Sequence, residues 1–228
     1  MRATDPTAYV VGLRPVNVGA AVGRVLLAAL LALTALTGAR AAAAAPLRLM
    51  VLGDSLTAGY GLPVARSFPV RLEAALRARG RAVAVLNAGV SGDTTAGGLA
   101  RLDWALAEKP DRVIVALGGN DGLRGLDSEA SFRNLDAILA KLAARGIPVL
   151  LAGMLAPPNL GREYGAAFNA IYPRLARKHK VPLYPFFLDG VATVPGLTQR
   201  DGIHPNARGV DVMVARILPR VLALIDGR

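Results

Sequence analysis

The chain has 228 residues, 53% of them hydrophobic, a formal net charge of +11 and no cysteine. Such a hydrophobic content excludes a disordered chain, and the length is that of one α/β domain with a leader. The lack of cysteine excludes disulfides, thiolate metal sites and a cysteine nucleophile.

An apolar run near the N-terminus predicts an export signal. The run covers 25–36, follows Arg24 and precedes the small-residue stretch 37–45. Because it is shorter than the roughly 20 apolar residues of a membrane-spanning helix, a cleaved signal peptide is favoured over an uncleaved anchor. We expect a signal peptide over 1–45, cleaved at about 39–45, and a periplasmic or secreted protein.

The mature domain, predicted over 46–228, keeps an excess of positive charge. The leader carries four arginines and one aspartate, so its removal lowers the net charge from +11 to +8. That charge would favour anionic membrane surfaces or acidic substrates, although a solvated basic surface is the simpler interpretation. No basic stripe interleaved with aromatic residues is present, so no nucleic-acid partner is expected.

The mature region alternates short aliphatic runs with helix-length amphipathic segments, the pattern of a parallel sheet with crossover helices. We predict an α/β fold, a three-layer sandwich around a five-stranded parallel sheet. In such a sheet, reactive groups gather at the carboxyl ends of the strands. The predicted strands are 48–52, 82–87, 112–117, 148–153 and 182–186; the predicted helices are 67–79, 95–108, 128–145, 162–178 and 206–225.

Few side chains could perform acyl transfer, which needs a nucleophile, a base, a group that orients the base and donors for an oxyanion. Of five serines, only Ser55 and Ser91 directly follow predicted strands. Of two histidines, His179 lies in a basic helix end, whereas His204 follows Asp201 by three residues at the start of the last helix. Ser55 could equally cap a helix and Asp201 form an ordinary turn.

Two further strand ends carry suitable donors. Gly89 follows the second strand, and its backbone N–H could approach a ligand closely because glycine has no side chain. Asn120 follows the third strand, within Gly-Gly-Asn-Asp, and its amide could donate to an oxyanion. Each could be only a glycine-rich turn, but together with Ser55 they fall at three successive strand ends.

In these blocks the chain resembles the SGNH/GDSL hydrolase family. The blocks are Gly-Asp-Ser-Leu at 53–56, the segment with Gly89, Gly-Gly-Asn-Asp at 118–121 and Asp-Gly-Ile-His-Pro at 201–205. Four blocks in the family's order are a specific match. The residues at 54–61 and 157–161 further resemble the bacterial periplasmic thioesterase I, lysophospholipase and arylesterase subgroup.

The resemblance implies a flavodoxin-like strand order and a serine esterase that forms an acyl-enzyme, without metal or cofactor. It implies Ser55 as nucleophile, His204 as general base and Asp201 as its orienting partner. Oxyanion donors would be Ser55, Gly89 and Asn120. The substrate would be a small-molecule or lipid ester, with peripheral membrane contact and a monomeric protein as further expectations. Substrate contacts would come from Asp54, Asp121, Leu123, Leu126 and Pro157.

Other hydrolase and nucleotide-binding patterns are absent: neither Ser55 nor Ser91 lies in Gly-x-Ser-x-Gly, and no Gly-x-Gly-x-x-Gly follows the first strand. Two alternatives remain open at this stage. One is a carbohydrate O-acetylesterase with the same catalytic groups, and the other is a non-catalytic lipid- or glycan-binding protein of the same fold.

Overall fold

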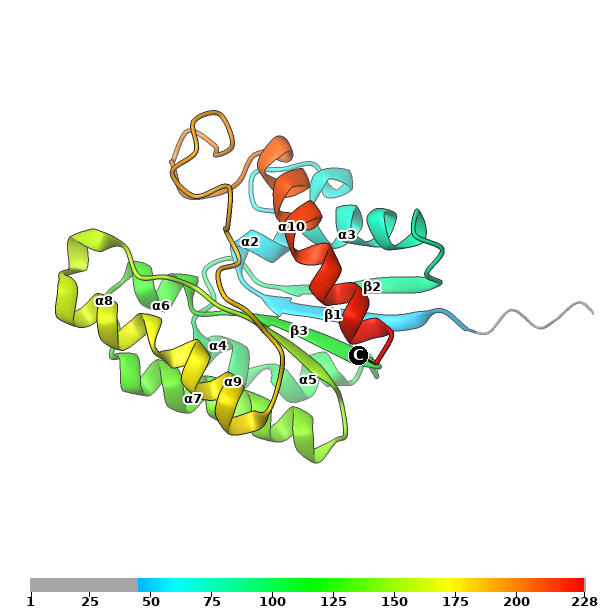
Figure 1. The fold of residues 1–228 in the computed structure, drawn as a ribbon, viewed down its shortest axis with the longest axis horizontal. Coiled ribbons are helices and arrows are strands. Elements are labelled where there is room, and N and C mark those ends of the chain that lie inside the picture. Colours follow the sequence, from blue (N-terminus) through cyan, green and yellow to red (C-terminus); the bar gives the residue numbers. More distant parts are fainter. Residues whose placement is uncertain (1–44, 228) are drawn as a thin grey trace, which may run out of the picture. The chain divides into compact units, whose positions relative to one another are not determined.

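A five-stranded parallel sheet lies at the centre of the structure, a computed structural model that describes residues 45–227. The predicted α/β class and flavodoxin-like order are confirmed, since the strands run β2-β1-β3-β4-β5 (Figure 1). Apart from its last residue, the predicted leader lies outside the described residues. The strands are β1 (Leu47–Gly53), β2 (Val83–Gly89), β3 (Arg112–Ala116), β4 (Val149–Ala152) and β5 (Leu183–Tyr184).

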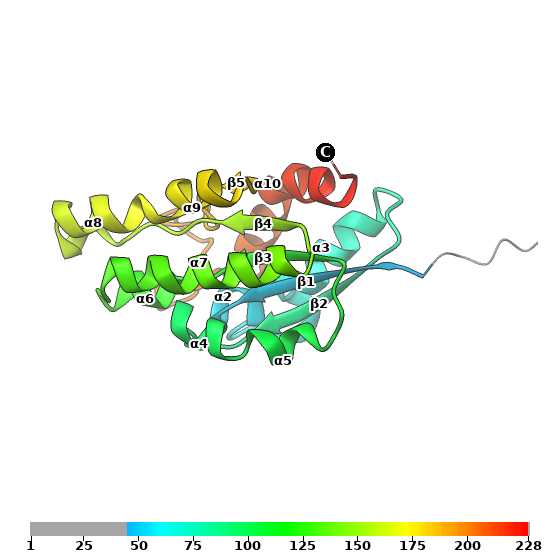
Figure 2. The ribbon, with the colours of Figure 1, turned by 90° about the horizontal axis from the view of Figure 1, so that it is seen from below.

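Helices cover both faces of this sheet, as the two views at right angles show (Figures 1 and 2). On one face, α3 (Phe68–Arg77) packs against α10 (Ala207–Ile225). The other face carries α4 (Thr95–Ala100), α5 (Leu102–Leu106), α7 (Ser128–Ala144) and α9 (Ile171–His179). Shorter elements are α2 (Ser55–Ala58), α6 (Gly119–Leu123), α8 (Arg162–Asn169) and the 3-10 turns η1 (Val64–Arg66) and η2 (Pro158–Leu160).

Two of the predicted helices are each divided in two. The segment predicted as one helix over 95–108 breaks at Arg101, whose backbone leaves the helical region at φ −98° and ψ 3°. The segment predicted over 162–178 breaks at Ala170, three residues before Pro173. Because proline has no N–H, Pro173 cannot donate to the carbonyl of Asn169 and complete a continuous helix.

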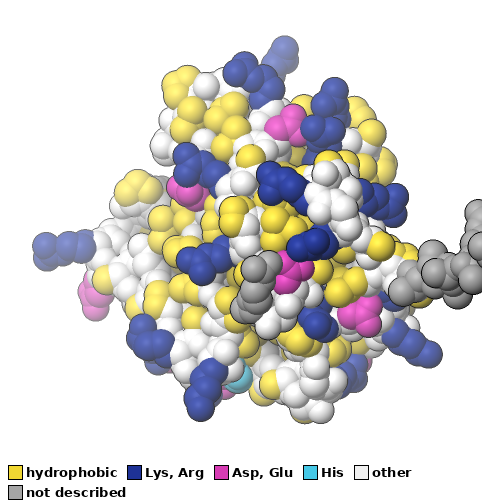
Figure 3. Space-filling model, turned by 45° about the vertical axis from the view of Figure 1, so that its right-hand side comes forward, with side chains coloured by type: hydrophobic (Ala, Val, Ile, Leu, Met, Phe, Trp, Pro, Cys, Tyr) yellow, Lys and Arg dark blue, Asp and Glu magenta, His cyan; other side chains and the backbone are white. Residues whose placement is uncertain are grey.

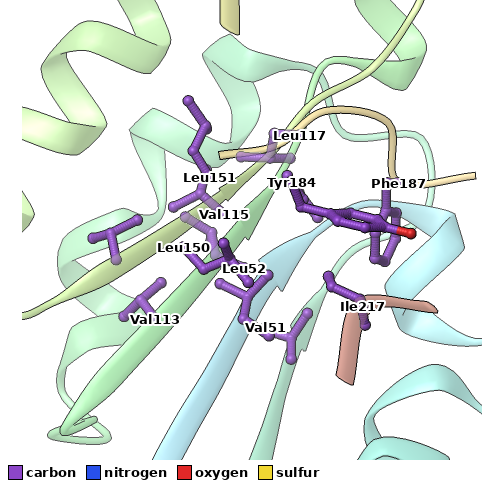
Figure 4. Close-up of a cluster of buried hydrophobic side chains, with 14 of the residues drawn as sticks. Val51, Leu52, Val113, Val115, Leu117, Leu150, Leu151, Tyr184, Phe187 and Ile217 are labelled. Carbon is purple, nitrogen blue, oxygen red and sulfur yellow. The ribbon is translucent and has the colours of Figure 1, made fainter. Parts of the chain in front are cut away.

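The core is formed by strands that are apolar on both sides, because helices cover both faces of the sheet. All residues of β4 are buried, as are the last five of β1 and the last four of β3. The apolar runs that predicted these strands are therefore explained by their central position. Figure 4 shows side chains of this core on both sides of the strands, among them Val51, Val115, Leu151, Phe187 and Ile217.

The register of the strands places the loops that follow β1, β2 and β3 side by side at one edge of the sheet. Gly53, the last residue of β1, pairs with Gly89 of β2 and with Ala116 of β3. A Cβ atom on Gly53 would lie 2.4 Å from Oγ1 of Thr57 and 2.9 Å from the carbonyl oxygen of Ala116, so this junction needs glycine. The residues that follow β1, β2 and β3 consequently meet at the carboxyl edge of the sheet.

The surface of the domain is basic. On the face seen in Figure 3, Lys and Arg side chains outnumber those of Asp and Glu, in keeping with the net charge of +8 on residues 46–228. Among the helices of residues 45–227, none combines the length and hydrophobicity needed to cross a bilayer.

Candidate active site

Ser55 stands where β1 turns into the short helix α2. Asp54 precedes it as the N-cap, and its Oδ1 accepts a hydrogen bond of 3.0 Å from the backbone N–H of Leu56. The carbonyl of Asp54 accepts from the N–H of Ala58 at 2.9 Å. These bonds hold the strand-to-helix turn in a single conformation, with Ser55 only partly buried at the sheet edge.

His204 joins Ser55 to Asp201 through two hydrogen bonds. Its Nε2 lies 2.9 Å from Oγ of Ser55, and its Nδ1 lies 2.7 Å from Oδ2 of Asp201. Ser55 and His204 are 149 residues apart in the chain, so the fold alone makes this contact. The three residues predicted as nucleophile, base and orienting group therefore form one hydrogen-bonded chain.

The carboxylate of Asp201 is held ionised. The backbone N–H groups of Ile203 and His204 both donate to its Oδ1, at 2.9 and 3.0 Å. The pKa of Asp201 is lowered to about 2, first by the backbone N–H of His204, with smaller contributions from the imidazole and from Ile203. An anionic partner on Nδ1 directs the lone pair of Nε2 toward the Ser55 hydroxyl.

The loop that carries Asp201 and His204 is fastened at several points. The N–H of Gln199 donates to the carbonyl of His204 at 2.7 Å, and its side-chain amide donates to the carbonyls of Tyr60 and Pro205. The ring of Tyr60 lies 4.5 Å from that of His204, centroid to centroid. Asn206 caps α10, accepting from the N–H of Gly209 at 3.0 Å. The imidazole is therefore positioned by its surroundings as well as by Asp201.

Asn120 lies on α6 beside the loop that follows β2. Its Nδ2 donates to the carbonyl of Asp93 at 2.9 Å and lies 3.5 Å from Oδ2 of Asp54. The first bond fixes the plane of the amide, and the second N–H makes only the long contact with Asp54, at the wall of the pocket that Ser55 also lines. The structure thus brings Asn120 to the site in the way that the sequence predicted.

Gly89 is not placed to donate to an oxyanion, contrary to the prediction. Its N–H donates to Oδ1 of Asn87 at 3.0 Å, and it packs against Thr57 and Ala58, where a Cβ atom would lie 2.4 Å from Oγ1 of Thr57. It is the last residue of β2, so its N–H belongs to the strand rather than to the loop beyond it.

Gly92 is the glycine of that loop that lies beside Asn120. It precedes Asp93, which binds the Asn120 amide through its carbonyl, and it has a φ of +85° that favours glycine. Among the described residues its N–H has no hydrogen-bond acceptor. Gly92 was not singled out from the sequence, because only the glycine nearest the predicted strand, three residues earlier, was considered.

Arg101 was also missed, and it ties two of the three loops together. Its Nε donates to Oδ2 of Asp93 at 2.5 Å, and its Nη2 donates to the carbonyl of Gly53 at 2.9 Å. The side chain is 17% exposed, so the ion pair is largely sheltered from solvent. Arg101 thereby links the residue before Asp54 to the loop that holds the Asn120 amide. An arginine in an amphipathic segment carries no sequence signal of such a role.

Asp121 forms a buried polar network and does not line the pocket. Its carboxylate accepts from the N–H of Thr95 at 2.9 Å, from Oγ1 of Thr95 at 2.6 Å and from Oγ of Ser131 at 3.0 Å. The side chain is 2% exposed. The predicted substrate contact of Asp121 is therefore replaced by a structural one, because its oxygens anchor α6 to α4 and α7.

A pocket of about 640 Å³ opens beside Ser55 and His204. Of the predicted substrate contacts, Asp54, Leu123 and Pro157 line it, whereas Leu126 does not. The wall is mostly apolar, so it suits a hydrocarbon chain better than a polar group. Its large apolar side chains are Leu56, Leu123, Met154, Leu155, Phe186, Leu188 and Ile203.

Burial perturbs one acidic group of this pocket. Asp54 is 1% exposed, and loss of hydration raises its pKa to about 6, although the N–H of Leu56 and the charge of His204 act in the opposite direction. Within residues 45–227, no three His, Asp or Glu side chains are grouped so that they could hold a metal ion.

A hydroxyl, an imidazole and a carboxylate hydrogen-bonded in that order, beside amide donors at the edge of a parallel sheet, define a serine hydrolase. The chain belongs to the GDSL-like lipase/acylhydrolase family, which matches residues 51–212. The family resemblance found in the sequence is thereby confirmed.

Individual relatives agree with this assignment. The chain is 42% identical over 201 residues to esterase TesA of Pseudomonas aeruginosa, in an alignment that covers 88% of this chain and 98% of that protein. It is 44% identical over 165 residues to thioesterase 1/protease 1/lysophospholipase L1 of Escherichia coli K12, covering 72% of this chain and 78% of that protein. The solved structure of AlinE4, an SGNH-hydrolase family esterase, matches with a TM-score of 0.67 and 49% identity, over 78% of this chain and 95% of AlinE4.

Proposed function

We propose that this enzyme hydrolyses acyl esters through a covalent acyl-enzyme on Ser55. Oγ of Ser55 attacks the ester carbonyl while Nε2 of His204 takes its proton, and Asp201 stabilises the imidazolium. The imidazolium then protonates the leaving alcohol. Water, deprotonated by His204, attacks the acyl-enzyme, and the imidazolium returns this proton to Oγ of Ser55 as the bond from Oγ to the acyl carbon breaks and the carboxylic acid is released. The observation that carries the proposal is the pair of hydrogen bonds, 2.9 and 2.7 Å, that join the three side chains.

The oxyanion would be bound by three N–H donors. We assign these to the backbone of Ser55, the side chain of Asn120 and the backbone of Gly92, which takes the role first expected of Gly89. The free N–H of Gly92, next to the residue that holds the Asn120 amide, supports this choice. Donors that are already oriented stabilise the tetrahedral intermediate without the cost of reorganisation.

The acyl part of the substrate would be an aliphatic chain. The wall of the pocket is mostly apolar and includes Leu123 and Pro157. It therefore supports an ester with an aliphatic acyl chain over the alternative substrate, an acetylated carbohydrate. The names of the relatives include esterase, arylesterase and thioesterase/lysophospholipase. Oxygen esters, thioesters and lysophospholipids share such a chain, and we propose this range of substrates here. An intact triad argues against a non-catalytic binding protein.

Hydrolysis of p-nitrophenyl esters of increasing chain length tests the proposal. We expect turnover by the wild type and a loss of at least about 10⁴-fold in kcat for Ser55→Ala, with an unchanged Tm. Ser128→Ala, which removes a partly exposed hydroxyl at the start of α7, is the matched control and should keep full activity. Turnover retained by Ser55→Ala would refute the assignment of the nucleophile.

We further propose that the enzyme is exported and acts as a monomer. The apolar run 25–36 and the small residues after it support a cleaved signal peptide over 1–45, followed by a hydrolase domain over 46–228. A monomer is supported because one chain supplies the triad and all three donors. N-terminal sequencing of the periplasmic or secreted protein should find a start at about 39–46, and light scattering should give the mass of one chain.

A further inference from the structure

Exposed apolar side chains collect around the mouth of the catalytic pocket. Leu123, Leu155 and Ile203 line the pocket and are each more than 40% exposed. Val194 adjoins Thr193 of the lining, and Leu126 closely follows α6. Tyr60, 52% exposed, lies against the ring of His204. We call these six residues the apolar rim: Tyr60, Leu123, Leu126, Leu155, Val194 and Ile203.

The apolar rim is assembled by tertiary structure. Its residues come from four separate segments: the turn after α2, the α6 region, the stretch after β4 and the loop before α10. Only four other large hydrophobic side chains are exposed in the described part of the chain, so the rim holds six of these ten. Clustered exposed apolar side chains next to a functional site mark a surface that contacts another apolar phase or molecule.

Three arginines without carboxylate partners flank the rim. Arg124 follows Leu123, Arg200 lies three residues before Ile203, and Arg162 begins α8 after the pocket-lining Pro158. All three are exposed, and none forms an ion pair with a carboxylate of the described residues. Arg124 donates only to backbone and amide oxygens, so its charge is not neutralised.

The nearest acidic groups offset this charge in part. Asp127 caps α7 and lies 3.7 Å from Arg133, and Asp201, which follows Arg200, is bound to His204, so both are already engaged, whereas Glu163 is exposed beside Arg162. The remaining excess is positive, as is the domain as a whole. Because the face in Figure 3 is basic as well, charge alone does not select the side that would meet an anionic surface. The position of the apolar rim selects that side.

We propose that the apolar rim and its three arginines dock the mouth of the pocket onto an anionic lipid bilayer. The rim side chains would enter the boundary between headgroups and acyl chains, and the arginines would bind lipid phosphates. An acyl ester could then pass from the bilayer into the pocket with little exposure to water. This inference rests on the proposed acyl-ester function, since it explains why three residues of the rim line that pocket.

Vesicle binding tests the proposal with Ser55→Ala protein, which leaves the lipids intact. Co-sedimentation is measured with phosphatidylcholine vesicles that contain 30% phosphatidylglycerol and with pure phosphatidylcholine vesicles. We expect binding to the anionic vesicles, which weakens with salt. Leu126→Asp/Val194→Asp should lower the partition coefficient by at least about 10-fold. The matched control, Val70→Asp/Trp104→Asp, adds the same charge at exposed apolar sites on α3 and α5 and should bind as the parent does.

The arginines are tested in the same way. Changing Arg124, Arg162 and Arg200 to Gln should weaken binding by roughly 100-fold, since each cation near an anionic surface contributes about a factor of five to ten. The control variant changes Arg79, Arg177 and Arg220 to Gln. These arginines are exposed outside the rim and have no carboxylate partner among the described residues. Equal losses in rim and control variants, or no binding of the parent to anionic vesicles, would overturn the proposal.

A soluble substrate separates this inference from the proposed function. With the Ser55 enzyme, Leu126→Asp/Val194→Asp should hydrolyse p-nitrophenyl acetate at the parental rate, because neither residue lines the pocket. Loss of vesicle binding with full turnover supports docking. No turnover by the parent would instead refute the esterase function, whatever the vesicle result.

Discussion

Replacing Asp54 by Asn should change the pH dependence of stability. In the folded protein Asp54 is buried, and its pKa is raised from the ordinary value of 3.8 to about 6, chiefly because burial disfavours the charged form. Between these values the folded state holds a proton that the unfolded chain has released. The stability that this proton provides is fully present below about pH 4 and is lost as the pH rises through 6.

The size of the effect follows from the two pKa values. The difference between 3.8 and about 6 corresponds to about 3 kcal/mol in the free energy of unfolding. Asparagine cannot ionise, but its oxygen can still accept from the N–H of Leu56 as the carboxylate does. Asp54→Asn should therefore gain about 3 kcal/mol relative to the parent between pH 4 and pH 7.5. The contact of the new amide with Asn120 changes the free energy of unfolding by the same amount at every pH, so it does not affect the change with pH.

Urea unfolding of both proteins, followed by circular dichroism at intervals from pH 4 to pH 7.5, measures this gain. All other titrating groups are common to the two proteins, so subtracting the curves removes most of their contribution and leaves that of Asp54 together with its interactions with charged neighbours. A difference that stays constant across this range would refute the reasoning, since it would mean that the buried carboxyl keeps an ordinary pKa.

Three further changes probe the site. Asn120→Ala should lower kcat for p-nitrophenyl butyrate by about 10²- to 10³-fold with little change in KM, and an unchanged kcat would exclude it as an oxyanion donor. Arg101→Met should loosen the loop that contains Asp93, and it should therefore lower kcat by about 10- to 100-fold with KM nearly constant. Arg101→Lys should lose less activity. A rise in KM alone would contradict a positioning role. Asp201→Asn should lower kcat by about 10⁴-fold. Since the pKa of Asp201 is about 2, its stabilising effect is present above about pH 4 and lost toward pH 2, and urea unfolding of Asp201→Asn should lack that loss.

The side chains proposed for catalysis could be selected from the sequence because so few candidates existed. With two histidines in the chain, one of them in a basic helix end, His204 and the preceding Asp201 stood out. Ser55 was one of only two serines directly after predicted strands. The parallel sheet then required these groups and Asn120 to share an edge, because all carboxyl ends of its strands point the same way.

The fine placement of backbone groups was not accessible. Gly89 and Gly92 both follow the aliphatic run of β2, and only the register Gly53 to Gly89 shows that the first is still within the strand. Arg101 was likewise unmarked, since its contact with the carbonyl of Gly53 spans 48 residues. Periodicity reports which face of an element is apolar, but it does not report where a strand ends to the residue.

By itself the sequence determined the order of strands and helices, the apolar core and the chemical groups available for catalysis, because hydrophobic periodicity and residue chemistry are local properties. Tertiary structure alone decided that the N–H of Gly92 is free, that Asp121 is an internal anchor and that exposed apolar side chains from three separate segments line one pocket. Those properties depend on contacts between residues far apart in the chain, and such contacts exist only after the sheet has fixed the register of its loops.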